Sequence, residues 1–186
     1  YMVARTGYTG EDGFEVILPA KNVCVFWETL LKRGVVPCGL GSRDTLRLEA
    51  GLNLYGADMN ESVSPLRCVL KWTLAFKGEM DFIGRQALRR ELKAGLKEKQ
   101  VGLILNGKGV LRAGYSVRTA FGGGTLTSGS YSPTLGCSIA LARVPAQSER
   151  ACEVEIRDRW HDARIVRPPF VRHGKIEVNM LQGETL

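Results

Sequence analysis

The stretch "TLTSGSYSPTLGCSIALARVP", residues 125–145, carries the clearest fold signal in the sequence. Two β-type runs meet there at a segment of Ser, Pro and Gly, the residue types that favour turns. The same pattern continues on both sides from Lys99 onward, where short β-type runs are cut at intervals of about ten residues. We therefore predict a small antiparallel barrel or sandwich, with "FGGGT" at 121–125 as a loose hairpin loop.

The first half of the chain mixes strand and helix patterns. "FEVIL" at 14–18 follows a glycine-containing turn and predicts a strand. "KNVCVFWETLLKRG" at 21–34 has its apolar residues at helical spacing and ends on a glycine suited to a C-terminal cap, Gly34. Strands and helices in one half and strands alone in the other predict an α+β protein.

Two further helices are expected before the β-rich half. One begins with Ser42 as its N-cap and stops at Gly51, which puts Arg43 and Arg47 on one helical face. The other follows Asp81 and runs to about residue 93. The change in character then predicts a domain boundary near residue 98, giving an N-terminal unit of residues 1–97 and a β-rich unit of residues 98–186.

Composition excludes several classes of protein. The five cysteines are odd in number and never form a CxxC pair, and the two histidines lack ligand spacing, so neither a disulfide framework nor a metal site is expected. No apolar stretch reaches the length of a membrane span, which predicts a soluble protein, and reduced structural thiols would suit a cytosol-like compartment. The net charge of +7 raises the question of nucleic acid, but acids interleave the basic stretches without an array of aromatics, so an acidic partner is favoured instead.

The segment "RTGYTGEDGFEV", residues 5–16, is dense in Gly, Thr and acids. A phosphate cradle is excluded because glycines of that kind follow a strand and open a helix, whereas these lead into a strand. A solvated turn would be the ordinary explanation. Glu15, however, shares its side of the strand with Ile17, so we expect this carboxylate to lie beside the core, where it would need a paired donor.

Arg43 and Asp44 form a second candidate constellation. An arginine in the first helical turn opposes the helix dipole, whereas its planar fork could grip a carboxylate or carbonyl in a cleft. Surface placement is equally consistent with the pattern. No Ser/His/Asp or Cys/His nucleophilic set is present, so the sequence displays no catalytic machinery of that kind.

Read together, these segments resemble the aminomethyltransferase of the glycine cleavage system, the T-protein family. The matching motifs occur in unbroken order over residues 3 to about 175: "RTGYTGEDGFEV", "GLGSRDTLRLEAGLNLYGADMNESVSPL", "WTLAFKGEMDFIGRQAL", "GKGVLRAGYSV" and "TSGSYSPTLGCSIALARVP", ending in "PPFVRHGK". They correspond to the C-terminal half of the family. The strand-like start at Tyr1, with no initiator methionine, agrees with a fragment.

The resemblance implies part of a central α/β folate-binding region followed by a C-terminal antiparallel β-barrel. It also implies transfer of a one-carbon unit from the aminomethyl-lipoyl arm of H-protein to tetrahydrofolate, with release of ammonia and without a metal. Glu15 matches the family's pterin-binding carboxylate, Arg43 its second pocket residue, and Tyr8 could supply an aromatic wall. Arg172 is a weaker candidate for the folate tail or the lipoyl entry.

The family's catalytic aspartate has no counterpart in these residues, so we expect the chain alone to be inactive. The expected partners are lipoylated H-protein and tetrahydrofolate, with neither nucleic acid nor membrane, in the cytoplasm or the mitochondrial matrix. Folate-dependent demethylases and the folate-binding regions of sarcosine and dimethylglycine dehydrogenases are alternatives. A related non-enzymatic protein of iron–sulfur assembly has a "KGCY" segment, where this chain reads "DFIGRQAL" at 81–88.

Overall fold

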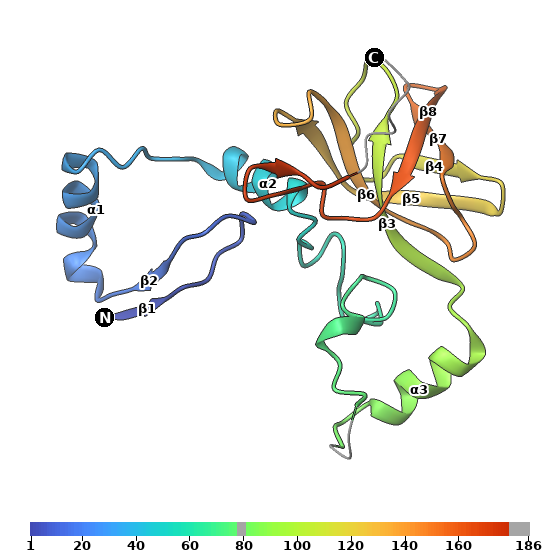
Figure 1. Cartoon of the computed structure of the whole chain (residues 1–186), viewed down its shortest axis with the longest axis horizontal. Coiled ribbons are helices and arrows are strands. Elements are labelled where there is room, and N and C mark those ends of the chain that lie inside the picture. Colours follow the sequence, from blue (N-terminus) through green and yellow to red (C-terminus); the bar gives the residue numbers. More distant parts are fainter. Residues whose placement is uncertain (78–80, 179–186) are drawn as a thin grey trace.

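The computed structural model describes residues 1–77 and 81–178, and its main feature is a closed antiparallel barrel (Figure 1). Six strands close in the order β3-β6-β5-β4-β7-β8. Their bounds are β3 Glu98–Leu105, β4 Ser116–Thr119, β5 Gly122–Ser132, β6 Cys137–Pro145, β7 Ala151–Ile156 and β8 Arg159–Val166. The structure thus confirms the α+β class and the C-terminal antiparallel barrel that the resemblance implied, and excludes the sandwich.

Side chains of the barrel strands bury themselves in two layers. The inner layer fills the barrel with residues such as Leu103, Leu126 and Val154. The outer layer covers one side of β3 and β6, where Leu48 and Phe170 pack on Ile139. Because β6 is therefore buried on both faces, its residues 139–142 are all apolar rather than alternating with polar residues.

Residues 122–125 of the segment "FGGGT" are strand rather than loop, which corrects the prediction. Gly122, Gly123 and Gly124 begin β5 and pair with β4, leaving only residues 120–121 as the hairpin turn. A Cβ at Gly124 would lie 2.4 Å from the carbonyl oxygen of Arg143. Glycine is required there because the neighbouring backbone approaches too closely for a side chain.

Three α-helices precede or adjoin the barrel: α1 Val23–Lys32, α2 Leu40–Glu49 and α3 Arg85–Ala94. All three were expected, and Gly34 and Gly51 follow α1 and α2 at positive φ, as C-terminal caps do. Ser42 is not the N-cap, however. The helix α2 starts two residues before it, with an extended Gly39 in the cap position, which glycine tolerates well.

The remaining elements are small. An N-terminal hairpin pairs β1 Met2–Ala4 with β2 Glu15–Ile17, and a second hairpin pairs β9 Val171–Arg172 with β10 Lys175–Ile176. Short 3-10 helices occupy Ala20–Asn22 and Lys71–Thr73. The β1–β2 hairpin and α1 lie on one side of the molecule and the barrel on the other, with α2 between them (Figure 1).

The expected burial beside Glu15 is wrong. Both Glu15 and Ile17 are exposed, with Ile17 at 66% of its full accessibility. The reason is that β1 and β2 form a sheet of only two strands, and no described element covers the face that these side chains share.

Candidate functional site

Tyr8 and Arg43 come together at the start of α2. The Arg43 guanidinium carbon lies 4.6 Å from the centre of the Tyr8 ring, a cation–π contact, and Arg43 is otherwise exposed. The Tyr8 hydroxyl donates a hydrogen bond to the carbonyl oxygen of Asn53. Partial burial raises the pKa of Tyr8, against the opposing effect of nearby Arg47. The Tyr8 ring is thus held by its hydroxyl and covered on one face by Arg43, while the Arg43 guanidinium stays accessible to solvent.

Glu15 is exposed at the start of β2. Its carboxylate accepts a hydrogen bond of 2.5 Å from the hydroxyl of Thr6 across the β1–β2 hairpin. Within residues 1–77 and 81–178, no hydrogen bond or ion pair joins Glu15 to Arg43. The carboxylate remains open to a further donor.

Arg172 lies on the segment that docks against the "TGEDG" turn. The backbone N–H of Gly174 donates to a carboxylate oxygen of Glu11 at 2.8 Å, and that of His173 to the carbonyl oxygen of Gly10 at 3.4 Å. Arg172 itself is exposed on β9. The backbone therefore carries Arg172 next to the turn that precedes Glu15, although no side-chain contact joins the two.

The same turn is packed tightly from behind. Gly10 has a φ of +77°, and a Cβ there would lie 2.5 Å from the Cβ of Ala50 at the end of α2. Arg5 and Asp12 close the turn with two hydrogen bonds of 2.9 and 2.8 Å, and this contact lowers the pKa of Asp12. Helix α2 thus positions both Arg43 and the turn.

A buried ion pair that the sequence analysis missed fixes α2 itself. Arg47, 3% exposed, donates to Asp58, 0% exposed, at 2.9 Å. The same carboxylate accepts hydrogen bonds from the backbone N–H of Leu54 and from the hydroxyls of Thr127 and Ser128 on β5. Arg47 was placed on the face of Arg43, but nothing local identified residue 58 as its partner.

Two further polar contacts join this region to the barrel. The side-chain amide of Gln100 on β3 donates to the side-chain oxygen of Asn53, whose carbonyl holds Tyr8. Glu49 at the end of α2 is buried and accepts hydrogen bonds from the hydroxyls of Ser132 and Thr134. The barrel therefore acts as the scaffold on which the Tyr8–Arg43 pair is held.

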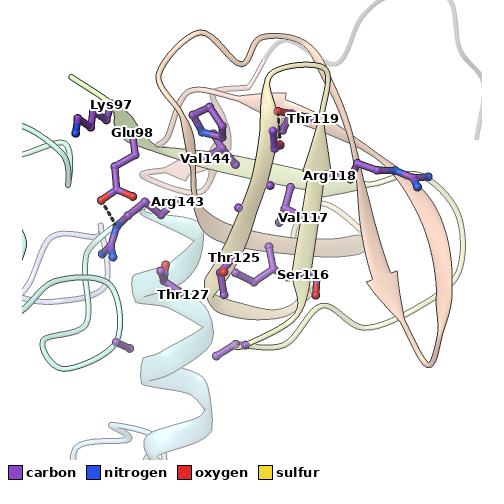
Figure 2. Close-up of a pocket in the computed structure, with 18 of the residues that line it drawn as sticks. Lys97, Glu98, Ser116, Val117, Arg118, Thr119, Thr125, Thr127, Arg143 and Val144 are labelled. Carbon is purple, nitrogen blue, oxygen red and sulfur yellow. Dashed lines mark hydrogen bonds and ion pairs between the residues drawn. The ribbon is translucent and has the colours of Figure 1, made fainter. Parts of the chain in front are cut away.

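A surface cavity of about 1230 Å³ lies on the barrel rather than beside these residues (Figure 2). It is lined by the β4–β5 hairpin and by Lys97, Glu98 and Arg143, with Glu98 and Arg143 directed toward one another at 3.7 Å. None of Tyr8, Glu15, Arg43 and Arg172 lines it. We place the candidate site at Tyr8 and Arg43 because an accessible guanidinium contacts an aromatic ring there, although the cavity on the barrel is more spacious.

The described residues offer no cluster of three or more His, Cys, Asp or Glu side chains that could hold a metal ion. Their five cysteines are all free thiols. None of the described helices has the length and apolarity needed to cross a bilayer. The Tyr8 ring and the Arg43 guanidinium themselves offer stacking, charge and hydrogen bonding toward a planar polar ligand.

Comparison with known proteins identifies the family. Residues 1–78 match the model of the GCVT N-terminal domain, and residues 98–172 match that of the glycine cleavage T-protein C-terminal barrel domain. An aminomethyltransferase of Pseudomonas syringae is 56% identical over 94% of this chain and 49% of its own length. An aminomethyltransferase of Methylococcus capsulatus is 57% identical over 92% of this chain and 48% of its own length.

A solved structure agrees. The glycine cleavage system aminomethyltransferase T from Bartonella henselae matches with a TM-score of 0.85 and 32% identity, over 94% of this chain and 50% of that one. The chain thus spans about half the length of the relatives it matches. With both family models matching in order and close relatives named aminomethyltransferase, the chain belongs to the glycine cleavage T-protein family of aminomethyltransferases.

Proposed function

We propose that this chain supplies the folate-binding part of an aminomethyltransferase of glycine cleavage. In that reaction a one-carbon unit passes from the aminomethyl-lipoyl arm of H-protein to tetrahydrofolate, and ammonia is released. The observation that carries the proposal is the stacking of Arg43 on Tyr8 within two family motifs. An aromatic wall beside an accessible guanidinium suits a flat heterocycle that bears a carbonyl group.

The proposed roles follow from the donors and acceptors of a pterin. Its amino group and ring N–H form a donor pair that a carboxylate accepts in bidentate fashion, and we assign Glu15 to that pair. Arg43 would donate to the pterin carbonyl, and Tyr8 would cover the ring. Arg172 would take a carboxylate of the folate tail.

Binding of tetrahydrofolate tests these roles. We would titrate the chain by calorimetry, alone and with the N-terminal half of a full-length relative added. Glu15→Ala and Arg43→Ala would be compared with two exposed control variants, Glu28→Ala on α1 and Arg33→Ala just after it. Loss of a charge-assisted hydrogen bond is worth about 1.5–3 kcal/mol, so each site variant should bind at least about tenfold more weakly. Arg43→Lys keeps the positive charge but lacks the planar guanidinium, so its affinity for tetrahydrofolate should remain as low as that of Arg43→Ala.

Two results would remove the proposal. Unchanged affinity in both Glu15→Ala and Arg43→Ala would take these residues out of the site. Absence of folate binding by the complemented wild-type chain would reject folate as the ligand.

We further propose that the catalytic step needs residues beyond these 186, since the chain spans about half of its relatives. The chain alone should release no ammonia from aminomethyl-lipoyl H-protein, and should regain activity with the missing half. Ammonia release by the isolated chain would contradict this.

The proposed protein partner is an acidic H-protein, in the cytoplasm or the mitochondrial matrix. Because the net charge of this chain is +7, we expect its binding to H-protein to weaken with added salt, and we expect no binding to DNA or RNA.

A further inference from the structure

One end of the barrel has a second cavity whose charged lining is entirely basic. Its volume is about 610 Å³, and two separate segments supply the cations: Lys108 and Arg112 from the β3–β4 connection, and Arg157, Arg159 and the neighbouring His161 from the β7–β8 hairpin. Tyr115 and Ile156 complete the wall, and no Asp or Glu lines it. The folate residues proposed above contribute nothing to this cavity.

The cations lack protein partners. Within the described ranges, Lys108, Arg112, Arg157 and Arg159 form no ion pair and no side-chain hydrogen bond. Arg118 on the neighbouring strand β4 differs, since it pairs with Glu153 through two hydrogen bonds. Four like charges around one concave site repel one another, and a bound anion would relieve that repulsion.

The first segment is held in place. Leu111 between the two cations is fully buried and donates its backbone N–H to the hydroxyl of Ser138 at 2.8 Å. Gly109 lies so close to the barrel that a Cβ there would be 3.0 Å from Leu105 and 3.3 Å from Ile156. This packing fixes the backbone between Lys108 and Arg112, so little backbone entropy is lost when these cations contact a ligand.

The second segment keeps a backbone conformation that its residues disfavour. Arg157 and Asp158 at the tip of the β7–β8 hairpin have φ values of +51° and +61°. Two-residue hairpins of this kind normally use Asn-Gly or Gly-Gly, because glycine adopts positive φ without steric cost. Glycine at residue 157 would relieve the strain but would remove a cation from the cavity.

We propose that this cavity binds a small ligand that carries two or more closely spaced anionic oxygen groups, phosphate or carboxylate. The proposal goes beyond the aminomethyltransferase function and does not depend on it. A concave site suits a small polyanion, since cations from two rigid segments can contact it from opposite sides. A broad acidic protein surface would need a flat basic face instead.

Calorimetric titration of the chain with inorganic pyrophosphate, at constant ionic strength, tests the site. We expect saturable binding of one pyrophosphate per chain. Arg157→Gly and Arg112→Gln should each weaken binding about tenfold or more, because each removes a charge-assisted contact from a different segment. Arg157→Gly should also leave the melting temperature equal or higher, since glycine fits the positive φ.

The matched control is Arg90→Gln, which removes one exposed charge from α3 and should leave the affinity unchanged. Equal weakening by Arg90→Gln would show general attraction and overturn the proposal. It would also be overturned if a deca-glutamate peptide bound at these residues while pyrophosphate did not, because the surface would then serve an acidic polypeptide.

Discussion

Replacing Asp58 with Asn isolates the contribution of the buried charge that joins α2 to the barrel. The amide has the shape of the carboxylate, and its oxygen can still accept from the N–H of Leu54. Its NH₂ group can face Thr127, whose hydroxyl then turns fully to the carbonyl oxygen of Leu141, 3.2 Å away. The variant therefore keeps most of the hydrogen bonds of residue 58. The change mainly removes the negative charge beside Arg47.

The contacts around Arg47 set the expected loss in the free energy of unfolding. Removing one partner of a buried ion pair costs about 3–5 kcal/mol. We expect about 3 kcal/mol, the lower end of that range, because Arg47 keeps Asp44 at 2.8 Å and the carbonyl oxygen of Leu52 at 3.3 Å. A domain of this size is stable by about 5–15 kcal/mol, so the loss is a large fraction of the total.

Urea unfolding followed by circular dichroism measures this loss. With a slope of about 2 kcal/mol per molar urea, the midpoint should fall by about 1.5 M. The control is Asp44→Asn, which removes the other carboxylate of the same arginine. Because the Asp44 side chain is 51% exposed, its loss should cost at most about 1 kcal/mol. Equal effects of the two variants, or a loss below about 1 kcal/mol for Asp58→Asn, would refute the reasoning.

Two further predictions use the packing of the turn and of the thiols. Gly10→Ala should destabilise the chain by more than about 1 kcal/mol, since it combines positive φ with a contact of 2.5 Å, whereas Gly13→Ala, with nothing within 4 Å, should change the urea midpoint little. Ellman's reagent at pH 8 should react quickly with the exposed Cys24 and Cys38 and not with the three buried thiols until urea unfolds the chain. Burial raises the pKa of Cys152 to about 12, so its thiolate is scarce at that pH; a third fast thiol would contradict this account.

Local sequence pattern predicted much of the fold because the relevant forces are local. Apolar residues at helical spacing and glycines at positive φ identified α1 and its end at Gly34. The hairpin glycines were misassigned for a non-local reason. Gly124 is needed because Arg143 lies behind it, and a glycine run reads as a loop when the neighbouring strand is unknown.

Some features of the candidate site were likewise predictable from the sequence, whereas others depended on tertiary packing. Motif resemblance selected Tyr8 and Arg43, and the structure does place them in contact. Alternation placed Glu15 and Ile17 on one face correctly but could not tell which face is covered, since burial depends on what packs against the sheet. The roles of Glu15 and Arg172 toward folate remain predictions for the binding experiment.

By itself, the sequence determined the family, the succession of helices and strands, and the glycine positions at which helices end. Only the tertiary structure decided the order in which the strands close the barrel, that Arg47 meets Asp58, and that Arg112 and Arg157 face one cavity. The physical reason is distance along the chain. Helical periodicity and turn chemistry act over a few residues, whereas an ion pair or a charged cavity depends on which distant segments the closed barrel brings together.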